Sequence, residues 1–184
     1  IDGNILKIRL KAPKHVEPNY RGGFKPEEAV QYDDWNGEGM EAEVWVQIKS
    51  ATGKVSVKDN QLVLENASEA EVYVVAATSY NGRFKSPGLE GLEPSKQAGE
   101  WMRLASGRSY ESIRKMHYQD YHALYGRVDL ALESKGTANI PTDKRIVNYA
   151  KDADPQMVAL LFNYGRYLLI SSSRHGGQAA NLQG

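Results

Sequence analysis

Polar side chains that can form several hydrogen bonds gather near the C-terminal end of the sequence, directly after a long apolar segment. They are Arg174, Gln178, Asn181 and Gln183. Guanidinium and amide groups supply the donors and acceptors with which a protein recognises sugar hydroxyls. The same composition is also typical of a polar loop between two helices, and composition alone favours that simpler interpretation. We treat these residues as candidate substrate-side residues.

The four histidines do not form a metal-binding pattern. His117 and His122 are five positions apart on one predicted helix, which places them about 140° apart around its axis. Zinc-binding pairs on a helix need spacings such as i and i+4. His15 and His175 stand alone in the sequence, and there is no cysteine to supply a thiolate ligand, a nucleophile or a disulfide. We therefore expect no metal site.

Two pairs of adjacent carboxylates, Glu27 with Glu28 and Asp33 with Asp34, lie in a polar stretch. A general acid and a general base must converge on one bond, whereas neighbouring side chains usually point apart. We interpret both pairs as solvated turn residues. The sequence contains no nucleophile elbow, phosphate-binding loop or dinucleotide-binding fingerprint, so no cofactor is expected.

The charge balance of the 184-residue chain narrows the choice of partners. Lys plus Arg and Asp plus Glu both number 23, which gives a net charge of zero. Nucleic acids and anionic membranes bind basic surfaces, so neither is expected as a partner. The sequence has no apolar run of about 18 residues that could span a bilayer. Because the first residue is Ile1, we expect the chain to be a processed or excised piece.

The first part of the chain has the pattern of an antiparallel β-structure. Alternating apolar and polar residues predict strands over 5–10, 40–48, 55–57, 61–65 and 71–77. The residues KDNQ, 58–61, predict a tight turn because Asp and Asn tolerate left-handed backbone angles, and 66–70 predict a second turn. Strands at this spacing indicate an antiparallel sheet or sandwich.

A long loop over residues 13–39 separates the first two predicted strands. It carries the aromatic residues Tyr20, Phe24, Tyr32 and Trp35. Loops of this length inside a compact domain are usually functional or packed against another part of the protein. We therefore expect this loop either to be functional or to pack against another part of the protein.

Helices are predicted in the second half of the chain, after a stretch rich in Gly and Pro over 79–94. Ser109 is placed to cap a helix over 110–125, and Thr142 to cap one that ends near Lys151. Alternation predicts a short strand over 127–132 between these two helices.

The last predicted helix, over 155–173, differs from the others in being apolar around nearly its whole circumference. Asp154 is its expected N-cap, and Pro155 occupies the first helical position. Gly176 and Gly177 can supply the backbone angles that end it. A helix that is apolar all round belongs inside a larger helical assembly. On its own it should drive self-association of the chain.

Six sequence blocks carry a family resemblance. One is FNYGRYLLISSSRHGGQAANLQG, residues 162–184. The others are APKHVEPNY, AVQYDDWNGEGM, VVAATSYNGRFKSP, SYESIRKMHYQDYHALYGRVDLAL and IPTDKRI. In their order along the chain they resemble glycoside hydrolase family 95, the inverting α-L-fucosidases, and they span essentially the whole chain.

The resemblance implies an α+β fold with three parts. Residues 1–79 would be the later part of an N-terminal antiparallel β-sandwich domain. Residues 80–151 would be a linker with helices and a short strand. Residues 152–184 would be the start of an (α/α)6 barrel domain, with its first inner helix.

The resemblance also implies the function of a glycoside hydrolase that removes terminal α-L-fucosyl, or the related α-L-galactosyl, residues from glycans with inversion. In that family the catalytic residues lie in barrel segments downstream of ANLQG. No catalytic residue is therefore assigned, and the chain alone is expected to be inactive. The implied partner is a fucosylated oligosaccharide or polysaccharide, and the implied location is secreted or periplasmic in a bacterium.

A second interpretation does not require catalysis. Trp35 and Tyr32 could stack on sugar rings, because aromatic faces pack against the apolar face of a pyranose. The chain would then be a non-catalytic carbohydrate-binding or structural β-sandwich module.

Overall fold

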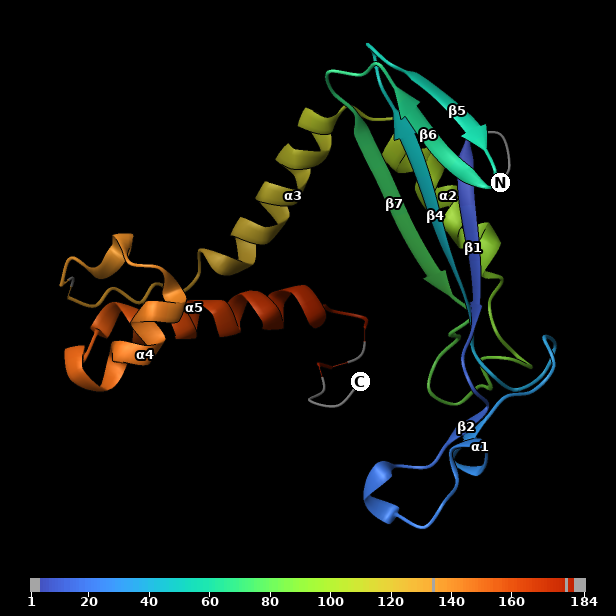
Figure 1. The fold of residues 1–184 in the computed structure, drawn as a ribbon, viewed down its shortest axis with the longest axis horizontal. Coiled ribbons are helices and arrows are strands. Elements are labelled where there is room, and N and C mark those ends of the chain that lie inside the picture. Colours follow the sequence, from blue (N-terminus) through green and yellow to red (C-terminus); the bar gives the residue numbers. More distant parts are fainter. Residues whose placement is uncertain (1–3, 134, 178, 181–184) are drawn as a thin grey trace. The chain divides into compact units, whose positions relative to one another are not determined.

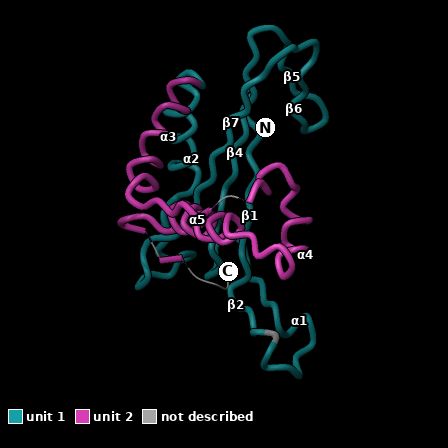
Figure 2. The backbone as a smooth tube through the Cα atoms, turned by 90° about the vertical axis from the view of Figure 1, so that its left-hand side faces the viewer, with its two compact units in different colours: residues 1–110 teal, residues 111–184 magenta. Residues whose placement is uncertain are grey.

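The computed structural model describes residues 4–133, 135–177 and 179–180. The chain divides into two compact units, Ile1–Tyr110 (unit 1) and Glu111–Gly184 (unit 2), which have separate colours in Figure 2. Figure 1 labels the helices and strands of both units. The fold is a mixture of helices and antiparallel sheets, as the α+β prediction required.

A three-stranded antiparallel sheet forms the centre of unit 1. Its strands are β1 (Ile5–Lys11), β4 (Glu41–Lys49) and β7 (Glu71–Thr78), in the order β1-β4-β7. Val44 of the central strand lies opposite Ile8 on one side and Ala76 on the other. The three strands predicted here from alternation are confirmed, with ends that differ by one residue.

A β-hairpin follows β4 in the chain. Strands β5 (Lys54–Lys58) and β6 (Gln61–Glu65) pair directly across a two-residue turn. Asp59 and Asn60 in that turn have φ angles of 49° and 59°, and Asn66 after β6 has a φ of 53°. Two successive left-handed residues match the right-handed twist of the flanking strands. Both predicted turns are confirmed at the residues expected to tolerate these angles.

The hairpin turn offers a stability test. Asn60→Gly should stabilise unit 1 by about 0.5 kcal/mol, because glycine adopts the left-handed region without the cost of a side chain. Asn60→Ala should destabilise it by about 1 kcal/mol for the opposite reason. Urea unfolding followed by tryptophan fluorescence is the measurement, and equal stability of the two variants would contradict the assignment of the turn.

Helix α2 (Pro94–Ser106) covers one face of the sheet and completes the core of unit 1. Ala98 and Met102 on this helix are 0% and 2% exposed, and Trp45 and Tyr73 on the facing strands are also buried. A methyl group added at Gly99 would lie 3.3 Å from the Trp45 ring, so the helix lies directly on that ring. The sequence pattern does not predict a helix over these residues.

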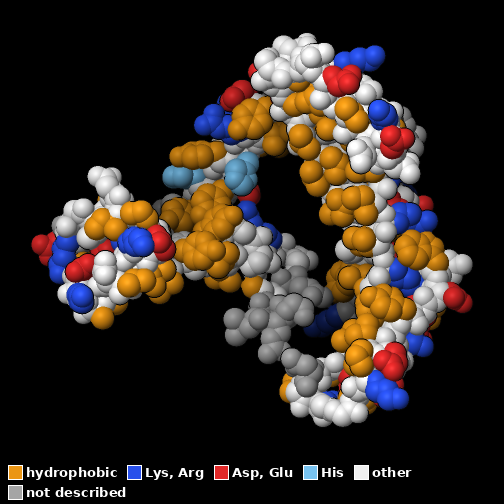
Figure 3. All heavy atoms as spheres, in the orientation of Figure 1, with side chains coloured by type: hydrophobic (Ala, Val, Ile, Leu, Met, Phe, Trp, Pro, Cys, Tyr) orange, Lys and Arg blue, Asp and Glu red, His pale blue; other side chains and the backbone are white. Residues whose placement is uncertain are grey.

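The opposite face of the sheet is apolar and open. Its exposed large side chains are Ile8, Leu10, Val72 and Val74. Apolar side chains gather along the sheet in Figure 3. Only one face of the sheet is therefore covered by the described residues, and that face carries the buried core.

The loop predicted over 13–39 contains short elements of its own. They are β2 (His15–Val16), η1 (Asn19–Arg21), α1 (Pro26–Ala29) and β3 (Val30–Gln31). Strands β2 and β3 pair with each other and carry an arm that extends beyond the end of the three-stranded sheet (Figures 1 and 2). The aromatic residues Tyr20, Phe24, Tyr32 and Trp35 are all exposed.

Unit 2 is helical. Its elements are α3 (Tyr110–Tyr125), η2 (Thr137–Asn139), α4 (Thr142–Asp152) and α5 (Pro155–Ser172). All three predicted helices are confirmed. Thr142 differs from its expected role, because it is the first helical residue of α4 and Pro141 precedes it as the N-cap.

The short strand predicted over residues 127–132 does not form. A strand needs a neighbour that accepts and donates backbone hydrogen bonds. Here the carbonyl of Val128 instead accepts a hydrogen bond of 2.8 Å from the side chain of Arg166. Alternating residues alone were not sufficient to specify a strand in this segment.

Helix α5 leaves its apolar surface open, and none of its residues is buried. Its exposed large side chains are Val158, Leu160, Leu161, Phe162, Tyr164, Tyr167, Leu168 and Leu169. The prediction that this helix is apolar on nearly every side is confirmed. Helix–helix contacts within unit 2 cover only a part of that surface.

We expect the chain to self-associate through α5. The apolar patch on α5 should drive association at high protein concentration because its burial removes apolar surface from water. Sedimentation velocity over a range of concentrations is the measurement. Leu161→Glu combined with Leu169→Glu should return the chain to a monomer, since both side chains are exposed. A wild-type chain that stays monomeric throughout the range would overturn this expectation.

Candidate functional site

The C-terminal candidate residues fall partly within the described structure. Arg174 is described, whereas Gln178, Asn181 and Gln183 lie outside the described residues, so their role stays a prediction. The backbone turns after α5: the Gly177 N–H donates to the Arg174 carbonyl at 3.0 Å, and Gly176 has a φ of 83°. The prediction that these glycines end the helix is wrong, because α5 ends at Ser172 with Ser173 as an extended C-cap, and the glycines form the turn that follows.

Arg174 is paired with a carboxylate that sequence analysis did not select. Its Nη2 lies 2.5 Å from Asp120 Oδ2, and its Nη1 lies 3.5 Å from Oδ1. Asp120 lies on α3, so the pair joins that helix to the turn after α5. Both side chains remain partly exposed, at 40% and 63%. An exposed ion pair contributes at most about 1 kcal/mol, so its main effect is to orient the two groups.

Arg166 makes a second connection between α5 and the end of α3. Its guanidinium donates to the carbonyls of Tyr125 and Val128 at 2.5 and 2.8 Å. It also lies 4.4 Å from the centre of the Tyr125 ring and 5.8 Å from that of Phe162. The carbonyls at a helix C-terminus lack intrahelical partners, and a cation is favoured there. Arg166 is therefore a structural residue that fixes where α3 ends.

Aromatic rings fill the contact between α3 and α5. Tyr121 is central, with ring centres 5.1 Å from Tyr125, 6.2 Å from Tyr167 and 6.3 Å from His117. Burial, followed by the proximity of Tyr125, raises the pKa of the Tyr121 phenol above its ordinary value. The phenol therefore stays neutral. The rings stack on one another, so this cluster serves packing, which agrees with the helical spacing of these residues in the sequence.

Asp154 fixes the start of α5 through a buried carboxylate. It is 2% exposed and accepts hydrogen bonds from Arg145 Nε at 2.9 Å and from the Gln156 backbone N–H at 3.1 Å. The Arg145 guanidinium lowers the pKa of the Asp154 carboxyl below its ordinary value. The predicted N-cap is confirmed. Its pairing with Arg145 on α4 also sets the corner between the two helices.

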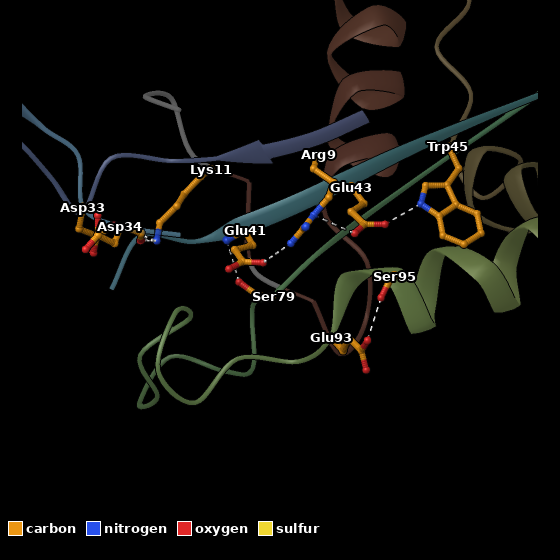
Figure 4. A network of polar contacts seen from close by, with 10 residues as sticks. All are labelled: Arg9, Lys11, Asp33, Asp34, Glu41, Glu43, Trp45, Ser79, Glu93 and Ser95. Carbon is orange, nitrogen blue, oxygen red and sulfur yellow. Dashed lines mark hydrogen bonds and ion pairs between the residues drawn. The ribbon is translucent and has the colours of Figure 1, made fainter. Parts of the chain in front are cut away.

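Unit 1 contains a polar network that runs from the core to the surface (Figure 4). The Trp45 indole N–H donates to Glu43 Oε2 at 2.7 Å, and Glu43 is buried. Arg9 Nε lies 3.5 Å from Glu43 Oε1, and Arg9 Nη2 lies 3.6 Å from Glu41 Oε2. The indole N–H and the Arg9 cation both hold Glu43, so this carboxylate has a structural role.

The acidic residues of the long loop are also held by specific contacts. Lys11, with a side chain only 5% exposed, places Nζ 2.9 Å from Asp33 Oδ1 and donates to the Asp34 carbonyl. Asp33 also accepts from the backbone N–H groups of Glu38 and Gly39. The Lys11 ammonium lowers the pKa of Asp33 below its ordinary value. Both residues lie in a turn, as expected, but Asp33 is not solvated: its side chain is only 15% exposed and anchors the turn through Lys11 and two backbone N–H groups.

Close backbone contact further fixes this loop. A methyl group added at Gly88 would lie 2.0 Å from the Gly37 carbonyl oxygen, and one added at Gly39 would lie 2.3 Å from that of Ala12. No side chain fits at such separations. The loop over 33–39 is therefore held from two sides by backbone.

The first pair of acidic residues lies in the arm. Glu28 Oε2 accepts a hydrogen bond of 3.3 Å from the Lys25 backbone N–H at the start of α1, and Glu27 lies in the same first turn. Negative side chains are favoured at the N-terminus of a helix. These contacts agree with the interpretation of both as turn residues.

Two general features of the described residues bear on function. Across 4–133, 135–177 and 179–180, no three His, Asp or Glu side chains come together in a way that could hold a metal ion. No helix in the described part of the chain is long and apolar enough to cross a membrane.

Comparison with known protein families finds a similarity to glycosyl hydrolases. Residues 109–184 match the family model described as the glycosyl hydrolase family 95 catalytic domain. The match begins one residue before α3 and includes α4, both of which sequence analysis assigned to a linker. The predicted boundaries at 79 and 151 stay predictions.

Individual relatives are α-fucosidases. The chain is 32% identical over 177 residues to Alpha-L-fucosidase 2 of Arabidopsis thaliana, covering 94% of the chain and 21% of that protein. It is 33% identical over 150 residues to Probable alpha-fucosidase A of Aspergillus niger, covering 78% of the chain and 19% of that protein. It is 29% identical over 143 residues to Probable alpha-fucosidase A of Aspergillus oryzae, covering 73% of the chain and 19% of that protein. The chain thus spans about a fifth of the length of these relatives.

Proposed function

We propose that this chain is part of a family 95 glycoside hydrolase that removes terminal α-L-fucosyl residues, or the related α-L-galactosyl residues, from glycans with inversion. The observation that carries the proposal is the alignment of 94% of the chain with an α-L-fucosidase at 32% identity. The match of residues 109–184 to the family 95 catalytic domain supports the same conclusion independently of that relative.

The same proposal gives the two units a place in a longer protein. Unit 1 would belong to a β-sandwich, in which a second sheet covers the open face that carries Val72 and Val74. Helix α5 would be the first inner helix of an (α/α)6 barrel. The exposed apolar side chains of the sheet and of α5 support this arrangement, because each surface needs a partner that excludes water.

Inversion requires two groups on opposite sides of the bond that breaks. One carboxylic acid protonates the departing oxygen while a held water attacks the anomeric carbon from the other face. By resemblance to the family, the acid and the water-holding residues belong to segments that follow residue 184. The part of the chain proposed to contribute at the substrate side is the turn with Arg174, together with Gln178, Asn181 and Gln183.

Hydrolysis of an aryl α-L-fucoside tests this function. A full-length protein that contains the chain should release the aryl group, and NMR of the sugar at early times should show the β-anomer as first product. The 184-residue chain alone should give no turnover. The matching aryl α-L-galactoside decides between the two sugars. Absence of turnover on both substrates by the full-length protein would refute the proposal.

The substrate-side role of Arg174 has a separate kinetic test in the active full-length protein. Arg174→Gln should raise KM more than it lowers kcat if the guanidinium contacts bound substrate. Asp120→Asn, which removes only the partner carboxylate, is the matched control. An equal and small effect of the two variants would assign Arg174 to the structure alone.

A location outside the cytoplasm also belongs to the proposal. It has support only from the family resemblance. Fractionation of the source cells, with hydrolysis of the aryl fucoside assayed in each fraction, tests it directly.

A further inference from the structure

Trp35 presents a partly exposed aromatic ring beside charged groups. It is 40% exposed, and the guanidinium carbon of Arg9 lies 4.7 Å from the centre of its ring. A cation over an indole face is attracted by the ring quadrupole. The side chain of Arg9 is itself 54% exposed, so its N–H groups remain accessible beside the ring.

The cation beside the ring is held by contacts that lead back to the core. Arg9 lies within 3.6 Å of carboxylate oxygens of both Glu41 and Glu43. Glu43 is buried and accepts the Trp45 indole N–H. Figure 4 shows this succession of contacts from Trp45 through Glu43 to Arg9. The guanidinium that lies over the Trp35 ring is therefore already held in place before a ligand stacks there.

The backbone that carries Trp35 is also fixed on both sides. Asp33 is anchored by Lys11, and Gly37 lies in backbone contact with Gly88. The ring is therefore presented by a rigid turn and not by a long free loop. Preorganised aromatic side chains of this kind are efficient binding groups because little entropy is lost on contact.

We propose that Trp35, together with Arg9 and Glu41, forms a carbohydrate-binding site on unit 1 for a neutral pyranose. The C–H face of the sugar would pack on the exposed indole surface, while its hydroxyls would pair with guanidinium N–H groups and a carboxylate oxygen. Only the class of ligand, a glycan, rests on the proposed function. The site belongs to unit 1 and is formed by its residues alone.

Titration calorimetry of the 184-residue chain tests the site. The probes are a fucosylated trisaccharide, α-1,2-fucosyllactose, with L-fucose and lactose alone in parallel. Trp35→Ala should lower the affinity for the sugar that binds by at least about tenfold, as expected for a central aromatic contact. Arg9→Lys, which keeps the charge but loses the planar donor group, should lower it by about threefold.

Trp101→Ala is the matched control, because Trp101 on α2 is a tryptophan of similar exposure, 45%, in the same unit. Its affinity should equal that of the wild-type chain. Thermal unfolding of each variant shows whether the fold is kept. Binding that survives Trp35→Ala, or no heat with any of the three sugars, overturns this inference.

Failure of this binding site and failure of the proposed enzymatic function would give different experimental results. A full-length protein that hydrolyses an aryl fucoside while the chain binds no sugar would leave the enzyme proposal standing and remove this site. Sugar binding at Trp35 in a full-length protein without hydrolytic activity would support this site and refute the enzyme proposal.

Discussion

Trp45→Ala is expected to destabilise unit 1 by about 3–5 kcal/mol, the usual cost of removing a large aromatic side chain from a core. Trp45 is buried against Gly99 of α2, its indole N–H donates to Glu43, and Lys7 lies 4.1 Å from its ring centre. The substitution leaves a cavity and also frees a buried carboxylate from one of its donors.

Urea unfolding followed by the fluorescence of the remaining tryptophans measures this effect. All three tryptophans of the chain, Trp35, Trp45 and Trp101, lie in unit 1, so the signal reports that unit. Trp101→Ala is the control and should change the stability by less than about 1 kcal/mol, since that side chain is 45% exposed. Equal losses for both variants would contradict the assigned core.

Asp154→Asn is expected to lower the melting temperature of unit 2 on the order of 10 °C, because it leaves the Arg145 guanidinium buried without a counter-charge. The amide retains an oxygen that can accept from the Gln156 N–H, so loss of the helix cap alone does not account for the effect. Far-UV circular dichroism reports the helices, whereas the tryptophan fluorescence of unit 1 should be unchanged.

The same residue gives the pH dependence a definite sign. The folded-state pKa of Asp154 lies below its ordinary value of 3.8. Its contribution to stability is therefore complete above that ordinary value and is lost as the pH falls through the lower folded-state pKa. Asp154→Asn should remove this part of the acid sensitivity. Asp143→Asn, at a side chain 73% exposed on α4, should leave it unchanged. A wild-type and an Asp154→Asn chain with identical acid profiles would refute this role.

The parts of the fold that sequence predicted well have local causes. Asp59 and Asn60 carry the left-handed angles of the hairpin turn, and Asp154 followed by Pro155 starts α5. In each case neighbouring residues supply the whole signal, so a single sequence is sufficient.

The parts that were missed depend on partners distant in the sequence. Asp120 and Arg174 are 54 positions apart, and neither residue alone indicates the other. Helix α2 is specified by its packing on Trp45, and the Gly- and Pro-rich stretch before it obscured its start. The alternation over 127–132 did not produce a strand, because no strand among the described residues pairs with this segment.

In the candidate site, too, locally determined features could be predicted, whereas contacts between distant residues could not. Gly176 and Gly177 indicate a turn from their types alone, but α5 ends earlier, at Ser172, with Ser173 in an extended conformation as its C-cap. The partner of Arg174 and the network that joins Trp35 to Arg9, Glu43 and Trp45 needed coordinates, since they link a loop to two strands. Residue types indicate which side chains can form hydrogen bonds. The structure is needed to show which of those side chains are already paired within the protein.

The open face of the sheet in unit 1 has a practical consequence for protein production. Val72 and Val74 point to that face and are 59% and 61% exposed. Exchanging both for threonine keeps a β-branched shape while adding hydroxyls, so the yield of soluble chain in expression should rise with little cost to folding. In a longer polypeptide that shields this face, the identical exchange would bury two hydroxyls and weaken domain assembly. Substitutions that improve the solubility of the isolated chain would therefore weaken the packing of this sheet in a longer protein.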